Sequence, residues 1–211
     1  MKFKAVCAVL LMAGSAAAQD GSRLDWAGPY AGFYVSRSTA EVTDDYDSTQ
    51  KFSFTVKGNG AGAQLGYNLQ HGALVFGLEG SFSSGTIEGV GECPAPTCNG
   101  TGTQPAIEID KSASLRARIG VAHQNMLYFA TFGKGFAESQ VIDPFQGGAD
   151  SQRHKGILAS VGIDWKFSSN LSAGAEYLYG RYEDIPYALI FTPDVIGFET
   201  RELRLGVKLS F

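Results

Sequence analysis

The clearest pattern in the chain is the strict alternation of apolar and polar residues at its end. One face of this stretch carries Leu203, Leu205, Val207, Leu209 and Phe211, and the other carries Glu202, Arg204, Gly206, Lys208 and Ser210. Successive side chains of a strand point to opposite faces, so the pattern predicts a strand with an apolar side and a charged side.

Seven further segments upstream read as strands, although the two faces of 30–40 and 126–140 do not separate cleanly. The predicted strands are 30–40, 52–68, 74–84, 106–122, 126–140, 155–167, 171–182 and 199–211. Short turns are expected near 69–72, 123–125 and 168–170, and long loops near 41–51, 85–105, 141–154 and 183–198. Long and short connections therefore alternate. This predicts an all-β fold, an eight-stranded antiparallel transmembrane β-barrel with short periplasmic turns and long extracellular loops.

A soluble up-and-down barrel of the lipocalin type would produce the same alternation, with its apolar side chains inside. The ends of the predicted strands favour the membrane barrel. Tyr67, Trp165, Phe167 and Phe211 all fall at the short-turn end, where an aromatic girdle meets the membrane interface.

The start of the chain is typical of a secretory signal peptide. Met1–Lys4 is basic, Ala5–Ala13 is apolar, and Ala16 and Ala18 form a small-residue cleavage site. We expect residues 1–18 to be a signal peptide, 19–29 a periplasmic leader and 30–211 the barrel domain.

Charge and cysteine content narrow the picture further. The chain has 17 Lys and Arg against 21 Asp and Glu, which argues against a nucleic-acid partner. Cys7 would leave with the signal peptide. Cys93 and Cys98 remain in an exported chain, so we expect a disulfide that closes a small loop rather than a metal or redox pair.

Several charged residues fall on the inward face of predicted strands at similar heights. They are Glu79, Arg116, Arg118, Glu176 and Arg204. An eight-stranded barrel is just wide enough for side chains to fill it, and buried charges must be paired. We therefore predict an internal ionic network, with Glu79 paired to Arg116 and Arg118, and Glu176 paired to Arg204. A selectivity filter made of the same residues is the alternative.

No catalytic or metal-binding constellation is visible, and we expect no enzyme activity and no cofactor. His71 and His123 lie in predicted turns and His154 at a loop edge, so each is interpreted as a solvated residue. The acidic loop residues lack the spacing of a calcium loop.

Three segments resemble the small outer-membrane barrels of Gram-negative bacteria, the OmpA-like or porin-family surface antigens. These segments are Trp26–Val35, with its W-x-G-x-Y-x-G opening, Ser114–Gly120 and Ala173–Tyr179; the closing strand Arg204–Phe211 is similar too. The resemblance implies a cell outer membrane location and Phe211 as the signal read by the barrel-assembly machinery. It also implies outer-membrane lipid, lipopolysaccharide and periplasmic chaperones as partners, and host surface molecules as further candidates.

The sequence thus predicts a non-enzymatic barrel that contributes to envelope structure and surface display. Two alternatives stay open, a narrow porin-like channel for ions or small solutes and a loop-mediated adhesin.

Overall fold

The computed structural model describes residues 25–46, 50–90, 106–143, 148–187 and 194–211, which form nine strands. These are β1 (Gly28–Tyr46), β2 (Gln50–His71), β3 (Leu74–Val90), β4 (Ala106–His123), β5 (Met126–Asp143), β6 (Gly148–Lys166), β7 (Leu171–Tyr182), β8 (Ile185–Tyr187) and β9 (Asp194–Ser210). In these ranges there is no helix of the length and apolarity needed to cross a membrane.

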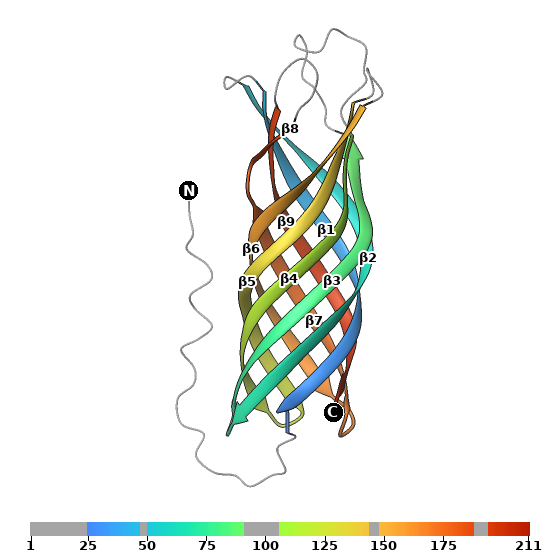
Figure 1. Cartoon of the computed structure of the whole chain (residues 1–211). Helices are drawn as coiled ribbons and strands as arrows, with labels where there is room; N and C mark the ends of the chain where they lie inside the picture. Colours follow the sequence, from blue (N-terminus) through green and yellow to red (C-terminus); the bar gives the residue numbers. More distant parts are fainter. Residues whose placement is uncertain (1–24, 47–49, 91–105, 144–147, 188–193) are drawn as a thin grey trace.

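Eight of the strands close into one antiparallel barrel. Each of β1 to β6 pairs with the next strand in sequence, β7 pairs with β9, and β9 pairs back with β1 from Tyr30–Ser210 to Asp45–Val195. The short β8 also pairs with β9, beyond the end of β7 (Figure 1). The predicted fold class, an eight-stranded antiparallel barrel, is therefore confirmed.

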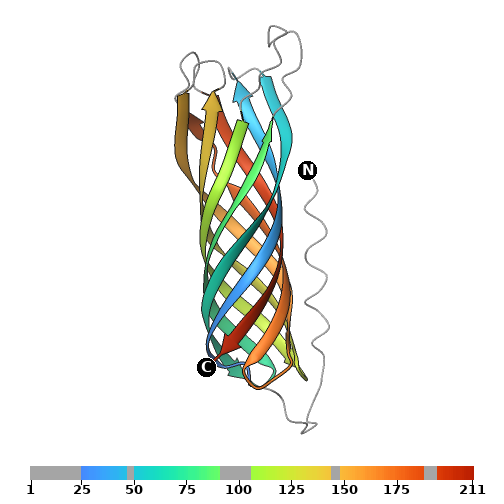
Figure 2. The ribbon, with the colours of Figure 1, turned by 90° about the vertical axis from the view of Figure 1, so that its right-hand side faces the viewer.

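The two ends of the barrel differ. At the lower end in Figures 1 and 2, where the C-terminus lies, the strands are joined by short connections at residues 72–73, 124–125 and 167–170. Gln124 and Gly72 have positive φ values of 53° and 60°, as tight hairpin turns require. The predicted short turns are present at this end.

Long loops at the opposite end are not confirmed, because the strands run into all four of the expected loop segments. Residues 41–46, 85–90, 141–143, 148–154 and 194–198 are all strand. A strand of ten or so residues suffices to cross a bilayer, whereas β2 has 22 residues. The wall thus continues beyond the lipid, where both faces can be polar and the alternation that marks a membrane strand disappears.

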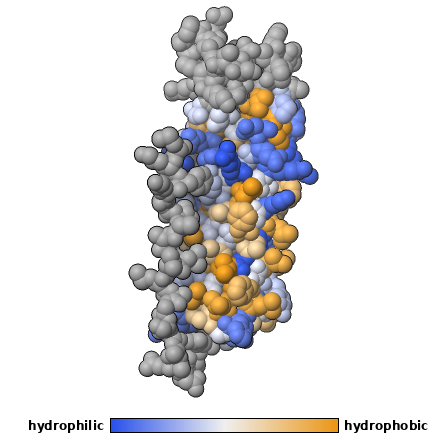
Figure 3. Space-filling model, turned by 90° about the vertical axis from the view of Figure 1, so that its left-hand side faces the viewer, coloured by the Kyte–Doolittle hydropathy of each residue, from blue (hydrophilic) through white to orange (hydrophobic). Residues whose placement is uncertain are grey.

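The outer surface is apolar over the lower part of the wall (Figure 3). Outward side chains there include Phe33, Leu65, Leu78, Leu115, Phe132, Ile157 and Leu205, each more than half exposed. The structure also assigns the two strands that sequence left ambiguous. On β1, Phe33 and Val35 face outward. On β5, Phe132 faces outward, whereas Phe129 and Thr131 face inward and are buried.

One predicted face is wrong. In the predicted strand 106–122, simple alternation puts Ile109 on the same outward side as Leu115, but Ile109 is 4% exposed and lies inside the barrel. The ladder between β4 and β5 shifts register between Ile109 and Lys111. A bulge of this kind adds one residue to a strand and reverses the faces beyond it.

Glycines of β2 make room for tyrosine rings in the lumen. A Cβ atom on Gly66 would lie 2.3 Å from Cζ of Tyr30, and one on Gly62 would lie 2.4 Å from Cζ of Tyr34. Only a residue without a side chain lets these rings lie flat against the wall. The core of the protein is therefore the filled lumen.

Candidate functional site

The centre of the lumen is occupied by Arg116 of β4. Its Nη2 atom lies 2.5 Å from Oε1 of Glu79 on the neighbouring β3, and its Nη1 atom lies 2.5 Å from Oε1 of Glu176 on β7. Nη1 also donates to the hydroxyl of Thr131 at 3.2 Å. Because Arg116 is completely buried and joins β4 to the far wall, this cluster crosses the whole lumen.

A second group of charges lies one step nearer the short-turn end. Arg118 contacts Asp164 of β6, and Lys208 of β9 lies 2.8 Å from the same carboxylate. The hydroxyl of Tyr30 donates to Oε2 of Glu79 at 2.6 Å, and Arg118 donates to that hydroxyl at 3.1 Å. The guanidinium of Arg118 also stacks 3.8 Å above the ring of Phe129.

Arg204 of β9 completes the network, with a partner that sequence reasoning missed. Its Nε atom lies 3.0 Å from Glu202, two residues away on the same face. The predicted partner, Glu176, is farther, at 3.9 Å. Glu176 instead accepts from Arg116 and from the hydroxyl of Ser160 at 2.6 Å.

The structure places all five predicted network residues inside the barrel and adds Asp164, Lys208 and Glu202. The network then contains equal numbers of carboxylates (Glu79, Asp164, Glu176 and Glu202) and cations (Arg116, Arg118, Arg204 and Lys208). Removing one partner of such a buried pair typically costs about 3–5 kcal/mol, because the other charge is left uncompensated. The network is thus a tightly coupled, electrically balanced layer.

The lower mouth is closed by Trp26. Its ring is 5% exposed and packs in a cluster with Val75, Ala122 and Leu127. Its backbone N–H donates to Gln70 at 2.6 Å, and the ammonium of Lys166 lies 4.7 Å from the ring centroid. We expect this segment to be part of a periplasmic leader, and its described residues pack against the short-turn end of the barrel.

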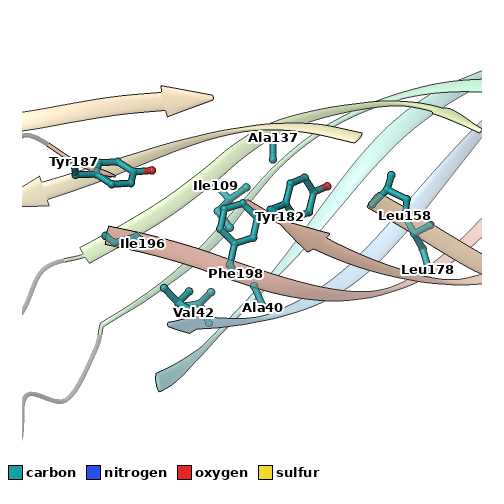
Figure 4. Close-up of a cluster of buried hydrophobic side chains, with 11 residues drawn as sticks. Ala40, Val42, Ile109, Ala137, Leu158, Leu178, Tyr182, Tyr187, Ile196 and Phe198 are labelled. Atoms are coloured by element: carbon teal, nitrogen blue, oxygen red, sulfur yellow. The ribbon is translucent and has the colours of Figure 1, made fainter. Parts of the chain in front are cut away.

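The upper lumen is filled by apolar side chains from eight strands. The cluster comprises Ala40, Val42, Val56, Ile109, Ala137, Leu158, Leu178, Tyr182, Tyr187, Ile196 and Phe198 (Figure 4). The rings of Tyr182 and Phe198 stack with centroids 4.6 Å apart. Above the ionic network, the barrel therefore contains a second and chemically different layer.

His154 lies in this upper layer, and its interpretation as a solvated loop residue is wrong. It is fully buried, 4.8 Å from the ring of Phe198. Its Nε2 atom lies 2.7 Å from the Tyr187 hydroxyl, which is 2.6 Å from the hydroxyl of Ser139. Its Nδ1 atom lies 2.9 Å from the carbonyl of Glu183, so His154 holds β8 to the wall. His71 and His123 are exposed beside the short turns, as expected.

The predicted interface aromatics all point outward near the short-turn end. Tyr67 is 54% exposed, and Phe211 is 71% exposed with its backbone N–H bonded to the carbonyl of Pro29. Trp165 and Phe167 lie side by side with centroids 5.7 Å apart. Aromatic rings in these positions suit the membrane–water interface on the periplasmic side of the barrel.

Two expectations fall wholly or partly outside the described residues. Cys93 and Cys98 lie in the segment 91–105, so their disulfide stays a prediction. No group of three or more metal-ligating side chains gathers within the ranges that the structure describes.

A closed barrel with an apolar outer belt and a polar, filled lumen defines the class of outer-membrane barrel proteins. Residues 5–211 match the family model described as "Outer membrane protein beta-barrel domain", and the chain belongs to this family. It is an outer-membrane protein.

Curated relatives agree with this assignment. The chain is 25% identical over 187 residues to a 25 kDa outer-membrane immunogenic protein of Brucella canis, covering 88% of this chain and 79% of the relative. It is 23% identical over 192 residues to a 22 kDa outer membrane protein of Rhizobium leguminosarum bv. viciae, covering 88% and 80%.

Solved structures resemble it more distantly. OprG of Pseudomonas aeruginosa matches with a TM-score of 0.49 at 10% identity, covering 88% of this chain and 96% of OprG. Ail of Yersinia pestis matches with a TM-score of 0.46 at 14% identity, covering 87% and 99%.

Proposed function

We propose that this protein is a non-conducting, non-enzymatic barrel that contributes to envelope structure and displays its extracellular end at the cell surface. The observation that carries this proposal is the filling of the lumen at three successive levels. The Trp26 cluster, the ionic network around Arg116 and the apolar cluster around Phe198 follow one another from the periplasmic to the extracellular end.

The remaining space supports a closed lumen. A space of about 40 Å³ lies between the two upper layers, lined by Ser36, Ser83, Ser112 and Glu202 among others. A second space of about 10 Å³ lies beside Asp164 and Lys208. A cavity needs roughly 10–15 Å³ measured in this way to hold one water molecule. Spaces of these two sizes hold a few waters each, which supports a lumen closed by side chains.

The surroundings of the histidines support the absence of catalysis. A nucleophilic site needs a base beside a nucleophile that substrate can reach. His154 does contact a hydroxyl, but both groups are buried under the apolar cluster and their hydrogen bonds are used within the wall. His71 and His123 are exposed, and each ends its strand directly before a short turn.

Export and assembly belong to the same proposal. Residues 1–18 act as a cleaved signal peptide, periplasmic chaperones carry the chain, and the assembly machinery recognises Phe211. Host surface molecules would meet the protein at the end of the barrel that carries β8.

A deletion strain tests this role against the channel alternative. We expect the deletion to increase leakage of periplasmic enzymes and sensitivity to bile salts, while uptake of small hydrophilic solutes stays unchanged. Complementation by the wild-type gene is the control. Slower solute uptake with an intact permeability barrier would reject the structural role and favour the channel.

A further inference from the structure

The barrel wall is interrupted near its extracellular end, between β6 and β8. The ladder between β6 and β7 ends at the pair Gly156–Tyr182, although β6 itself extends to Gly148. Beyond Tyr182 the chain follows β9 instead, through three pairs from Ile185–Ile196 to Tyr187–Asp194. In the part of the chain that the structure describes, no ladder joins β6 to β8. The two strands therefore meet without the regular pairing that holds the rest of the wall.

One backbone hydrogen bond and the ring of His154 connect the two sides. The N–H of Glu183 donates to the carbonyl of Lys155 at 2.9 Å. Nδ1 of His154 lies 2.9 Å from the Glu183 carbonyl, and Nε2 lies 2.7 Å from the Tyr187 hydroxyl. We call this set of contacts the His154 seam, with His154 and Lys155 on one side and Glu183 and Tyr187 on the other. Segments held by few backbone hydrogen bonds open locally with little free energy.

The hydrogen bonds of the closed seam fit a neutral imidazole. A backbone carbonyl only accepts, so Nδ1 carries the proton that it donates to Glu183. Nε2 of the neutral ring then accepts from the Tyr187 hydroxyl, and Tyr187 accepts in turn from Ser139 at 2.6 Å. A second proton on Nε2 would reverse this chain and place a full positive charge in a site where His154 is completely buried.

No carboxylate bonds to the ring among the described residues. The titratable groups on the elements around it are Glu138 on β5, Asp150 on β6, Glu183 and Asp184 before β8, Tyr182 on β7 and Tyr187 on β8, while β9 presents Phe198. Glu138 is paired with Arg153 at 2.8 Å, and the carboxylate of Asp184 is exposed. Burial lowers the pKa of His154 below its usual value, and the Glu183 carbonyl and the Asp184 carboxylate oppose this shift only in part.

The seam lies on the outer side of the membrane. Counted from the end of β6 at Lys166, a rise of about 3.3 Å per residue and a tilt of about 40° place His154 roughly 30 Å above the short turns. The apolar band of such barrels is about 25 Å tall. The proton concentration of the external medium therefore acts on this histidine.

We propose that the His154 seam is an acid-sensitive device, closed at neutral pH and opened when the external medium becomes acidic. Opening brings the ring into water, where it takes a proton, and the protonated ring no longer fits the buried site. The open seam exposes Tyr187 and the edge of β6 from Gly148 to Lys155. The seam lies above the ionic network around Arg116, so the inference is independent of whether the lumen conducts.

The direction and size of the effect follow from proton linkage. The closed seam has the lower histidine pKa, so its stability is fully present above the open-state value of about 6.5 and is lost as the pH falls through that value. The ratio of closed to open molecules should fall about fourfold by about pH 6 and up to about 30-fold by about pH 5. The loss levels off below the pKa of the closed state.

Amide hydrogen exchange, followed by NMR on the folded protein in lipid nanodiscs, tests the seam. The probe is the Glu183 amide, which bonds across the seam to Lys155. After correction for the intrinsic exchange rate, its protection factor should fall at least about tenfold between about pH 7.5 and about pH 5. The amide of Val161, which lies within the β6–β7 ladder, should keep its protection.

Two variants separate His154 from the other titratable groups. His154→Gln retains a side chain that can donate and accept but takes no proton, so its Glu183 protection should not depend on pH. His71→Gln is the matched control, because His71 is exposed directly before a short turn, and it should behave like the wild type.

Three exchange results would overturn the proposal. They are a constant Glu183 protection factor in the wild type, a wild-type pH dependence in folded His154→Gln, and an equal loss at Val161, which would indicate unfolding of the whole barrel. Titration of the His154 ring in the wild-type protein, also by NMR, needs no variant to fold. A closed-state pKa at or above the ordinary value of about 6.5 would contradict the proposal, and a lower value would support it.

Discussion

Replacing Arg116 by methionine tests the balance of charge in the lumen. The substitution keeps most of the side-chain volume but removes the cation that lies 2.5 Å from both Glu79 and Glu176. The remaining cations are more distant, with Arg118 3.5 Å from Glu79 and Arg204 3.9 Å from Glu176. One carboxylate is then left without compensation in a site where Arg116 was fully buried.

The expected loss of stability is about 3–5 kcal/mol, the usual cost of removing one partner of a buried ion pair. This is a change of roughly a hundredfold to several thousandfold in the unfolding equilibrium, at about 1.4 kcal/mol per factor of ten. A second substitution, Glu79→Gln, restores equal numbers of opposite charges. The double variant Arg116→Met/Glu79→Gln should therefore regain about 2 kcal/mol, because coupled residues do not contribute additively.

These differences in the free energy of unfolding can be measured by equilibrium unfolding in urea. The protein is folded in phospholipid vesicles, and tryptophan fluorescence is the readout. Trp26 lies at the lower mouth and Trp165 faces outward near the short turns, so both report on the barrel. Arg201→Met is the matched control: Arg201 faces outward, its side chain is 48% exposed, and it lies 3.6 Å from Glu41. Exposed pairs contribute about 0–1 kcal/mol. Equal, small losses for Arg116→Met and Arg201→Met would show that the buried charges are not coupled in this way, as would a double variant less stable than Arg116→Met.

Further predictions concern packing, assembly and oxidation. Gly66→Leu should destabilise the barrel by about 1–3 kcal/mol in the same assay, because the new side chain displaces the Tyr30 ring; a stability equal to wild type would show that the ring moves freely. Deletion of Phe211 should reduce the amount of protein in outer-membrane fractions while purified protein still refolds in detergent, and normal membrane levels would argue against a terminal assembly signal. Thiol labelling of denatured protein from the envelope should require prior reduction of Cys93 and Cys98; labelling without reductant would exclude their disulfide.

The strand pattern could be predicted from sequence wherever the wall faces lipid on one side and the lumen on the other. That asymmetry explains the alternation from Leu203 to Phe211. It also explains why Ile157 and Trp165 face outward. The alternation of apolar and polar residues disappears above the membrane, where the outward side chains of Arg153 and Lys155 are as polar as many lumen residues. The upper parts of the strands were therefore mistaken for loops.

The bulge at Ile109 marks a second limit. Apolar residues on both sides of it keep the same odd numbering in sequence, so no change in pattern signals that the faces have reversed. The apolar cluster in the upper lumen was missed for the same reason. Its members, such as Ile109 and Phe198, look like membrane-facing residues until the register is known.

The ionic network could be predicted in membership but only partly in pairing. Counting residues from the short turns identified Arg116 and Glu79, which are direct cross-strand partners. Glu176 and Arg204 are cross-strand partners too, yet Glu176 turns toward Arg116 across the lumen. Contacts across a barrel depend on its closure and stagger, which no single strand encodes.

The most direct test of whether side chains close the lumen is to record current through the folded protein in a planar lipid bilayer. We expect no discrete conductance for the wild type, and leak or brief openings for the triple variant Glu79→Ala/Arg116→Ala/Phe198→Ala. Reproducible single-channel steps in the wild type, altered by the same substitutions, would contradict it and make the internal charges part of a conducting path.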